Sequence, residues 1–238
     1  MAADKAQRSA SNAMISQFYS SIAKSVVWEW MPQLLEGVRH TLEMALLSFA
    51  LSVILGLIVA LMRMSEKRVI SWTAIVFIEV FRGTPLLVQL FIIYYALPAV
   101  GLIFSPFVAG VIGLTLNSAA YISEIYRSGF LSIDAGQKEA GKAIGMTGLQ
   151  IQLQVLIPQA VLVSIPNLAG YGVTILKSTS LASIVSAPDL MMYAHDLSSE
   201  YFMPMKVYLI TALLYIIMAY PLSRGAQHLE KVMGRGRR

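Results

Sequence analysis

Positions 41–64 form a run of Leu, Ile, Val and Ala with Gly56 near its centre. An α-helix rises about 1.5 Å per residue, so this run is long enough to cross the roughly 30 Å hydrocarbon core of a bilayer. Within lipid, a helix pairs all of its own backbone polar groups, whereas a lone strand leaves them unpaired. The run therefore predicts a transmembrane helix, which ends at a basic cluster of Arg63, Lys67 and Arg68.

The composition places the rest of the chain in the membrane as well. Of 238 residues, 57% are hydrophobic and 13% are charged, whereas a soluble domain is about half apolar and a quarter charged. The absence of cysteine excludes disulfides and thiolate metal sites. The net charge of +5 lies in segments that flank apolar runs, so it indicates topology and not nucleic-acid binding. Polar residues interrupt 15–27, so we expect no cleavable signal peptide.

Four further apolar runs follow, at 69–97, 107–125, 159–176 and 207–222. The first of these is too long for a straight crossing and contains Gly83-Thr84-Pro85, where we expect a kink. The third contains Pro166 and two glycines, and we expect it to bend. The fold class is therefore an all-α, polytopic membrane protein with five transmembrane helices.

Three regions follow from this pattern. Residues 1–37 form an N-terminal tail and interfacial segment, disordered over 1–13 and amphipathic over 14–37. Residues 38–222 form the transmembrane domain, and 223–238 a basic tail.

Basic residues indicate the orientation of the five spans. Eleven of them fall on one side and six on the other, and the side with more belongs in the cytoplasm. This rule places the N-terminus outside and the C-terminus inside. The loop at 134–158 is then cytoplasmic.

The loop at 134–158 carries signals for a short helix, a turn and a second short helix. Asp134 is a helix N-cap, and Gln137 is placed to complete a capping box with it. Gly145 suits a left-handed turn at the helix end. Thr147 and Gln150 repeat the capping spacing. Pro158 then stops or kinks the helix that follows.

The same loop resembles the EAA loop of ABC-importer permeases. It reads Glu139-Ala140-Gly141, three residues, Gly145, nine residues, and Val155-Leu156-Ile157-Pro158. In that family the loop forms a coupling helix that sits in a groove on an ATP-binding subunit. Gly141 departs from the family's alanine and costs about 1 kcal/mol of helix propensity. The resemblance implies that coupling is carried by five residues, Glu139, Ala140, Gly141, Ala143 and Gly145.

The resemblance also implies the partners. They are two ATP-binding cassette subunits, a second permease subunit, identical or paralogous, and an extracytoplasmic substrate-binding protein, in and around a bacterial inner membrane. The chain itself has no phosphate-binding loop and no zinc-protease motif. We therefore expect no enzyme activity, metal or cofactor in this chain, with ATP and magnesium held by the partner subunits.

Two opposite charges, Glu79 and Arg82, lie three residues apart inside the second span. An unpaired charge at mid-membrane costs at least about 2.5–3.5 kcal/mol, so we expect a mutual salt bridge. The alternative is that one of them meets a charged substrate or gates the pore. With Gly83-Thr84-Pro85 and Gln89 they resemble a signature of the polar amino-acid branch of these permeases.

Other candidate substrate residues come from the third and fourth spans. Asn117 opens a run that resembles the amino-acid branch, although an interhelical hydrogen bond alone would also explain it. Lys177, Thr179 and Ser180 resemble a family stretch in which a lysine and hydroxyls meet a substrate carboxylate; a snorkelling lysine is the alternative. Tyr171 stands where relatives that carry basic amino acids can have an acid, which disfavours a cationic substrate.

The sequence thus predicts a permease subunit of an ATP-driven importer for polar amino acids. A permease for an opine or osmolyte is the first alternative. A channel or intramembrane enzyme that needs no ATPase is the second, with Glu79, Arg82 and Lys177 lining its path. His195 and the acids near it in 177–206 fit no standard metal spacing, and we expect this outer loop to contact a partner.

Overall fold

The computed structural model describes residues 2–235, and the side chains of residues 28–233. Every regular element in this range is helical, which confirms the all-α class. The α-helices are α1 (Ala2–Arg63), α2 (Arg68–Gly83), α3 (Leu86–Phe91), α4 (Pro106–Leu131), α5 (Ala135–Ala143), α6 (Gly148–Gln150), α7 (Ile157–Ser178), α8 (Leu190–Tyr201) and α9 (Pro204–Arg235). The π-helical segments are η1 (Ile92–Ala96) and η3 (Ile151–Leu156); the 3-10 segments are η2 (Leu97–Val100) and η4 (Thr179–Val185).

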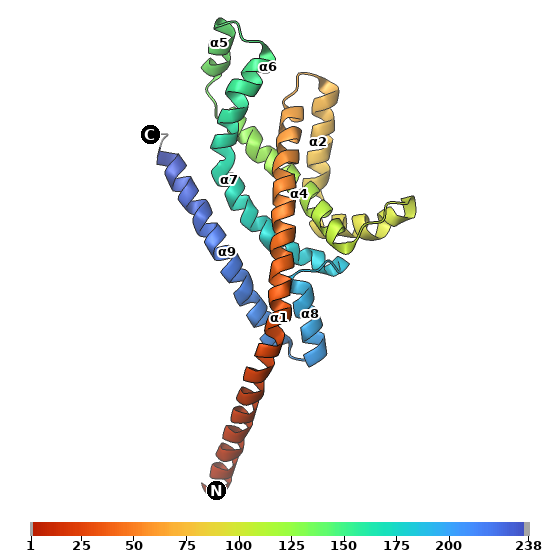
Figure 1. The fold of residues 1–238 in the computed structure, drawn as a ribbon, viewed down its shortest axis with the longest axis vertical. Helices are drawn as coiled ribbons and strands as arrows, with labels where there is room; N and C mark the ends of the chain where they lie inside the picture. The colour runs from red at the N-terminus through yellow and green to blue at the C-terminus, as the bar shows by residue number, and fades with distance from the viewer. Residues whose placement is uncertain (1, 236–238) are drawn as a thin grey trace.

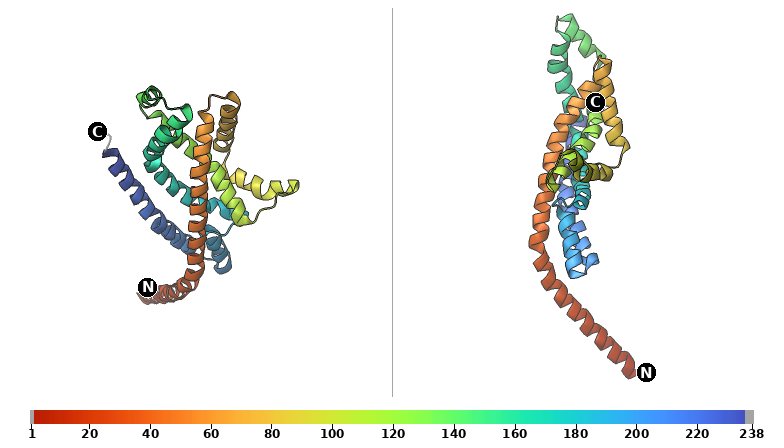
Figure 2. Two further views of the ribbon diagram at one scale, coloured as in Figure 1. Left: turned by 45° about the horizontal axis from the view of Figure 1, so that its top comes forward. Right: turned by 90° about the vertical axis from the view of Figure 1, so that its right-hand side faces the viewer.

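The helices form a layered bundle around α1, which runs most of the length of the molecule (Figure 1). α4 packs along α1, α7 packs on α4, and α9 packs on α7. Short helices α5 and α6 lie at one end and α8 lies toward the other. The first turns of α1 project beyond the other helices (Figure 2). Within residues 2–235, four helices are long and apolar enough to span a membrane, and a fifth span results if the bent pair α2 and α3–η2 is counted as one.

The N-terminal region differs from the prediction. We expected disorder over 1–13, but α1 runs without a break from Ala2 to Arg63, and Met1 lies outside the described residues. The interfacial position of 14–37 stays a prediction. Trp30 and Leu34 are fully buried in the main hydrophobic cluster. Trp30 also packs edge-on against Tyr201, with ring centroids 5.5 Å apart. These contacts attach the last part of the segment to the bundle, which local amphipathicity alone does not reveal.

The second span bends by 105° between α2 and the α3–η2 segment. Thr84 is extended (φ −116°, ψ 145°), as expected for a residue before proline, and Pro85 has no backbone N–H for a continuing helix. A break at Gly83-Thr84-Pro85 is confirmed, but the structure is more than a kinked crossing. The 16 residues of α2 run along the bundle, and the α3–η2 segment extends sideways from it (Figure 1).

Two other spans are longer than the apolar runs that predicted them. α4 begins at Pro106, after an N-cap at Ser105, and continues to Leu131. α9 continues to Arg235 and passes through most of the predicted basic tail; its candidate span is Pro204–Met233. These extensions carry polar residues into the end of the bundle that also holds α5.

Asp189 caps α8 from a fully buried position outside the apolar spans. Its carboxylate accepts a hydrogen bond from the Met192 amide at 2.8 Å and one from the Tyr215 hydroxyl at 3.3 Å. Burial raises the pKa of Asp189 to about 6, although the bonds from the Met192 amide and the Tyr215 hydroxyl oppose this rise.

We expect this carboxyl to make stability depend on pH. Between about pH 4 and pH 6 the folded state holds a proton that the unfolded state has lost, so stability falls as pH rises through this window, by about 3 kcal/mol in all. Thermal unfolding in detergent from about pH 4 to pH 8 measures this loss. Asp189→Asn keeps the cap and should flatten the profile, whereas exposed Asp196→Asn should not. Equal profiles for wild type and Asp189→Asn would contradict the assignment.

Candidate translocation cleft and coupling loop

A cleft of about 600 Å³ opens where the α2–α3 break meets α4 and α7. Its position follows from the break, because the 105° bend moves α3 away from the line of α2. Residues from α2, α3, α4, α7, η4 and the break line it: Arg82, Gly83, Thr84, Pro85, Leu86, Asn117, Tyr121, Tyr171, Thr174, Ser178 and Leu181.

Gln89 and Asn117 hold the break open. Gln89 Nε2 donates to the Phe81 carbonyl (2.9 Å), to the Thr84 carbonyl (3.1 Å) and to the Thr84 hydroxyl (2.8 Å). Asn117 Nδ2 donates to the Phe81 carbonyl (2.9 Å) and to Gln89 Oε1 (3.1 Å). Carbonyls freed by the break are therefore paired by side chains, as membrane depth requires. The interhelical hydrogen bond considered for Asn117 is present.

Arg82 has a different partner from the one predicted. No ion pair joins it to Glu79 among the described residues; instead its guanidinium lies over the Tyr121 ring, 5.3 Å from the centroid. Tyr121 in turn stacks on Tyr171, with centroids 5.8 Å apart and planes 25° apart. A cation over an aromatic face is stabilised by the ring quadrupole. Arg82 is exposed on the cleft wall, and no carboxylate among the side chains of residues 28–233 pairs with it.

Of the predicted substrate residues, the cleft brings together Arg82, Asn117 and Tyr171. Glu79 is exposed on α2 but does not line the cleft. Lys177 faces a separate groove between α7 and α9. Thr179 is fully buried and donates to the Leu176 carbonyl, and Ser180 donates to the Lys177 carbonyl. We therefore leave Glu79, Lys177, Thr179 and Ser180 out of the cleft.

Sequence reasoning missed four polar residues of the cleft. They are Thr84, Tyr121, Thr174 and Ser178. Tyr121 lies four residues after Asn117, and Thr174 and Ser178 lie three and seven residues after Tyr171. This helical spacing puts these three on the face of a residue that was predicted, and would have been the signal. Thr84 was predicted only as part of the break.

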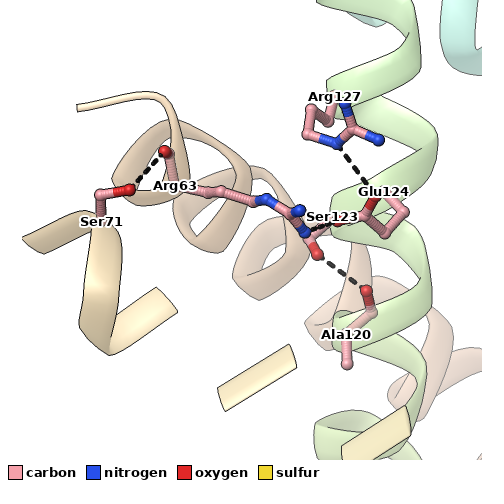
Figure 3. A network of polar contacts seen from close by, with 6 residues as sticks. All are labelled: Arg63, Ser71, Ala120, Ser123, Glu124 and Arg127. Atoms are coloured by element: carbon pink, nitrogen blue, oxygen red, sulfur yellow. Dashed lines mark hydrogen bonds and ion pairs between the residues drawn. The ribbon is translucent and has the colours of Figure 1, made fainter. Parts of the chain in front are cut away.

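A charge cluster joins α1, α2 and α4 (Figure 3). Glu124 on α4 pairs with Arg63 from the end of α1 and, at 2.9 Å, with Arg127. The Ser71 hydroxyl of α2 donates to the Arg63 carbonyl at 2.9 Å. One partly buried carboxylate thus pairs with two guanidinium groups and ties the end of α1 to α4, while the Ser71 bond ties it to the start of α2.

The loop at 134–158, called the coupling loop from here on, has most of its predicted local structure. Asp134 accepts from the Gly136 amide at 2.7 Å and caps α5. Gly145 has φ +81°, in the left-handed region. Thr147 and Gln150 form the predicted capping box. Gln137 does not complete the box with Asp134; its Oε1 accepts from Gln159 Nε2 at 3.3 Å.

The second helix of this loop is not a separate short element. α6, η3 and α7 follow one another as a single helical stretch that belongs to a candidate span from Gly148 to Val185. Pro158 therefore does not stop the helix, and the kink that was the alternative stays a prediction. The wider π-helical turns of η3 precede it, at the place where its missing N–H would leave a carbonyl without its partner.

Residues 52–235 match the family described as binding-protein-dependent transport system inner membrane component. The chain belongs to this family. It is 35% identical to the probable amino-acid ABC transporter permease protein YckA of Bacillus subtilis (strain 168), over 80% of this chain and 89% of that relative. It is 40% identical to the L-cystine transport system permease protein TcyB of the same organism, over 86% and 88%.

A solved structure agrees with this membership. The crystal structure of an amino acid ABC transporter with histidines matches with a TM-score of 0.80 and 35% identity, covering 87% of this chain and 96% of that one. The chain is therefore a multi-pass membrane permease subunit of an ABC importer, and this confirms the predicted class over the channel and intramembrane-enzyme alternatives.

The coupling loop of this permease exposes an apolar tip. Ile144 is 78% exposed and Leu149 is 69% exposed. Glu139, Ala140 and Ala143 are also exposed, whereas Gly141 is buried against Ile151. A Cβ at Gly141 would lie 2.8 Å from Ile151 Cγ1. The sequence showed this glycine only as a loss of helix propensity, whereas in the structure it permits close packing against Ile151. Ile144 and Leu149 were missed because isolated apolar residues in a polar loop carry no periodic signal.

Proposed function

We propose that this permease carries polar amino acids through the cleft at the α2–α3 break. The relatives are named for amino acids and cystine, and the structural neighbour for an amino acid transporter. The observation that carries the proposal is one exposed guanidinium on the wall of a cleft whose lining residues include no carboxylate. Arg82 suits the α-carboxylate that all amino acids share.

The other polar groups of the cleft suit the rest of such a substrate. Asn117 uses its amide nitrogen for both of its bonds, which leaves Oδ1 to accept from an ammonium group. Thr84, Thr174 and Ser178 add hydroxyls for a polar side chain. A cleft without an acid gives no counter-charge to a cationic side chain, so neutral polar or acidic amino acids fit best.

The coupling loop supplies the second half of the proposal. As part of an ATP-driven importer, this chain has its loop at 134–158 in the cytoplasm, where the loop docks on an ATP-binding subunit. The N-terminus then lies outside a bacterial inner membrane and the C-terminus lies inside. Ile144 and Leu149 are apolar side chains that a groove on the partner would bury, and Glu139 is a charge for its rim. Two ATP-binding subunits hold ATP and magnesium. A second permease subunit completes the pore, and a binding protein delivers the solute.

The test is uptake by the whole complex in proteoliposomes. The permease is purified from its native membrane together with the subunits that accompany it, and a panel of labelled amino acids is offered with the binding protein. Arg82→Ala should reduce uptake at low solute concentration about 10- to 100-fold, the equivalent of one charge-assisted hydrogen bond. Arg68→Ala, an exposed arginine at the start of the same helix, is the control.

Three results would contradict parts of the proposal. The first is uptake by Arg82→Ala at the wild-type rate. The second is a preference for an osmolyte or opine over every amino acid in the panel. A permease that is purified alone and still conducts would also remove the ATPase partners from the proposal.

A further inference from the structure

A second groove, of about 400 Å³, lies between α7 and α9. Thr174 lines both this groove and the cleft, so the two hollows adjoin at this residue of α7. Lys177 and Asn167 face the groove from α7, and Ser223, Gln227 and Glu230 face it from α9. None of these five residues lines the cleft.

Both walls of the groove carry polar side chains, whereas the earlier turns of α9 expose apolar ones. Asn167, Thr174 and Lys177 are exposed and recur at helical spacing on α7. Half-buried Ser223 and exposed Gln227 and Glu230 recur in the same way on α9. By contrast, the exposed residues of the preceding turns of α9 include Leu209, Leu213 and Ile216. Exposed polar groups on membrane helices face water or protein and not lipid.

The two faces of α9 separate a polar from an apolar hollow. Leu222 and Leu229 line a different groove, of about 660 Å³, formed with α1 and α7 and walled almost entirely by apolar side chains. Ser223, next to Leu222 in the chain, faces the polar one. Adjacent residues at the same depth therefore meet opposite environments.

The polar groove also points in a defined direction. α9 rises beside α7 toward the end of the bundle that carries α5, and its C-terminal end lies on that side (Figure 1). Lys177 is close to the end of α7 that adjoins the cleft, and Glu230 is close to the C-terminal end of α9. No ion pair ties either side chain to another described residue, so both charges stay available.

We propose that the groove between α7 and α9 is the water-filled inner half of the translocation path. A polar solute leaves the cleft past Thr174 and moves along the groove to the cytoplasmic end of α9. Lys177 and Glu230 present opposite charges to the carboxylate and ammonium groups of an amino acid on this route. The inference rests on the orientation and the solute class of the proposed function.

The chain offers a clean accessibility test because it contains no cysteine. Ser223→Cys and Leu222→Cys place one thiol each, at equal depth, in the polar and in the apolar groove. Both are made in the whole complex, in inside-out vesicles, and labelled with a membrane-impermeant maleimide. Thiols react as thiolates, which form in water and not in lipid. We expect Ser223→Cys to label at least about tenfold faster, since burial in an apolar site raises the pKa of a thiol.

Gln227→Cys against Leu229→Cys repeats the comparison one turn further along. Equal labelling within both pairs overturns the inference. If no thiol is labelled, the groove is filled by lipid or closed by a second subunit. If all four are labelled fast, the polar groove is no more accessible to water than the apolar one. Each variant is first shown to support uptake.

Glu230→Gln tests the role of the charge. We expect a several-fold lower maximal uptake rate with an unchanged half-saturating solute concentration, whereas Arg82→Ala should raise that concentration. An unchanged maximal rate would remove Glu230 from the path.

The difference in labelling rate between the polar and apolar positions does not depend on which solute is carried. If it is present while no amino acid is taken up, only the proposed substrate fails; if it is absent while amino acid uptake is normal, only the groove fails.

Discussion

Gly145→Glu should reduce uptake more than tenfold while the protein still inserts and assembles. Gly145 has φ +81°, where a side chain costs about 1–2 kcal/mol, so the turn that sets the angle of α5 would shift. The added charge would also sit beside Ile144, at the apolar tip that we propose to dock on the ATP-binding subunit. The measurements are solute uptake and ATP hydrolysis by the reconstituted complex, with hydrolysis retained but no longer raised by the loaded binding protein.

Gly145→Asn is the control for this substitution. Asparagine tolerates the left-handed region, and no atom lies within 4 Å of a Cβ at this position. Its uptake should stay close to wild type. Normal uptake by Gly145→Glu would instead separate this turn from coupling.

Gln89→Leu should destabilise the protein and abolish uptake together. The change removes the buried amide that donates to the Thr84 carbonyl and hydroxyl and that accepts from Asn117 across two helices. The Asn117 amide then loses one of its two acceptors in a partly buried site, and an unpaired buried group costs about 1–3 kcal/mol. The wall formed by Thr84 and Pro85 would then rearrange. Thermal unfolding in detergent and uptake in proteoliposomes measure the two effects.

Val88→Leu, at the exposed neighbouring position, is the matched control and should change neither quantity. If Gln89→Leu unfolds at the wild-type temperature, then the break is held by packing and not by this amide.

The coupling loop could be predicted in detail because its signals are local. Asp134, Gly145 and the Thr147–Gln150 box each act on the backbone within a few residues, so their spacing in the sequence determines their geometry. Gln137 is the exception, since its partner, Gln159, lies 22 residues away. Partners at such separation depend on how two helices pack, which local spacing does not specify.

The cleft could be predicted only in part for the same reason. A break at Gly83-Thr84-Pro85 follows from proline chemistry, but its 105° angle depends on Gln89 and Asn117, which meet across two helices. Glu79 and Arg82 have the spacing of a salt bridge, yet the ring of Tyr121 on α4 is what Arg82 meets. Lys177 faces another groove, because contacts with α4 and α9 set the rotation of α7 about its axis.

One continuous helix joins the base of the coupling loop to the wall of the cleft. It runs from Gly148 through η3 and into α7, and Ile151 near its start packs against Gly141 of α5. Tyr171, Thr174 and Ser178 lie near its far end. At about 1.5 Å per residue such a helix is more than 30 Å long. A tilt of α5 on a partner's surface would therefore be passed through one element to the three residues that face the solute.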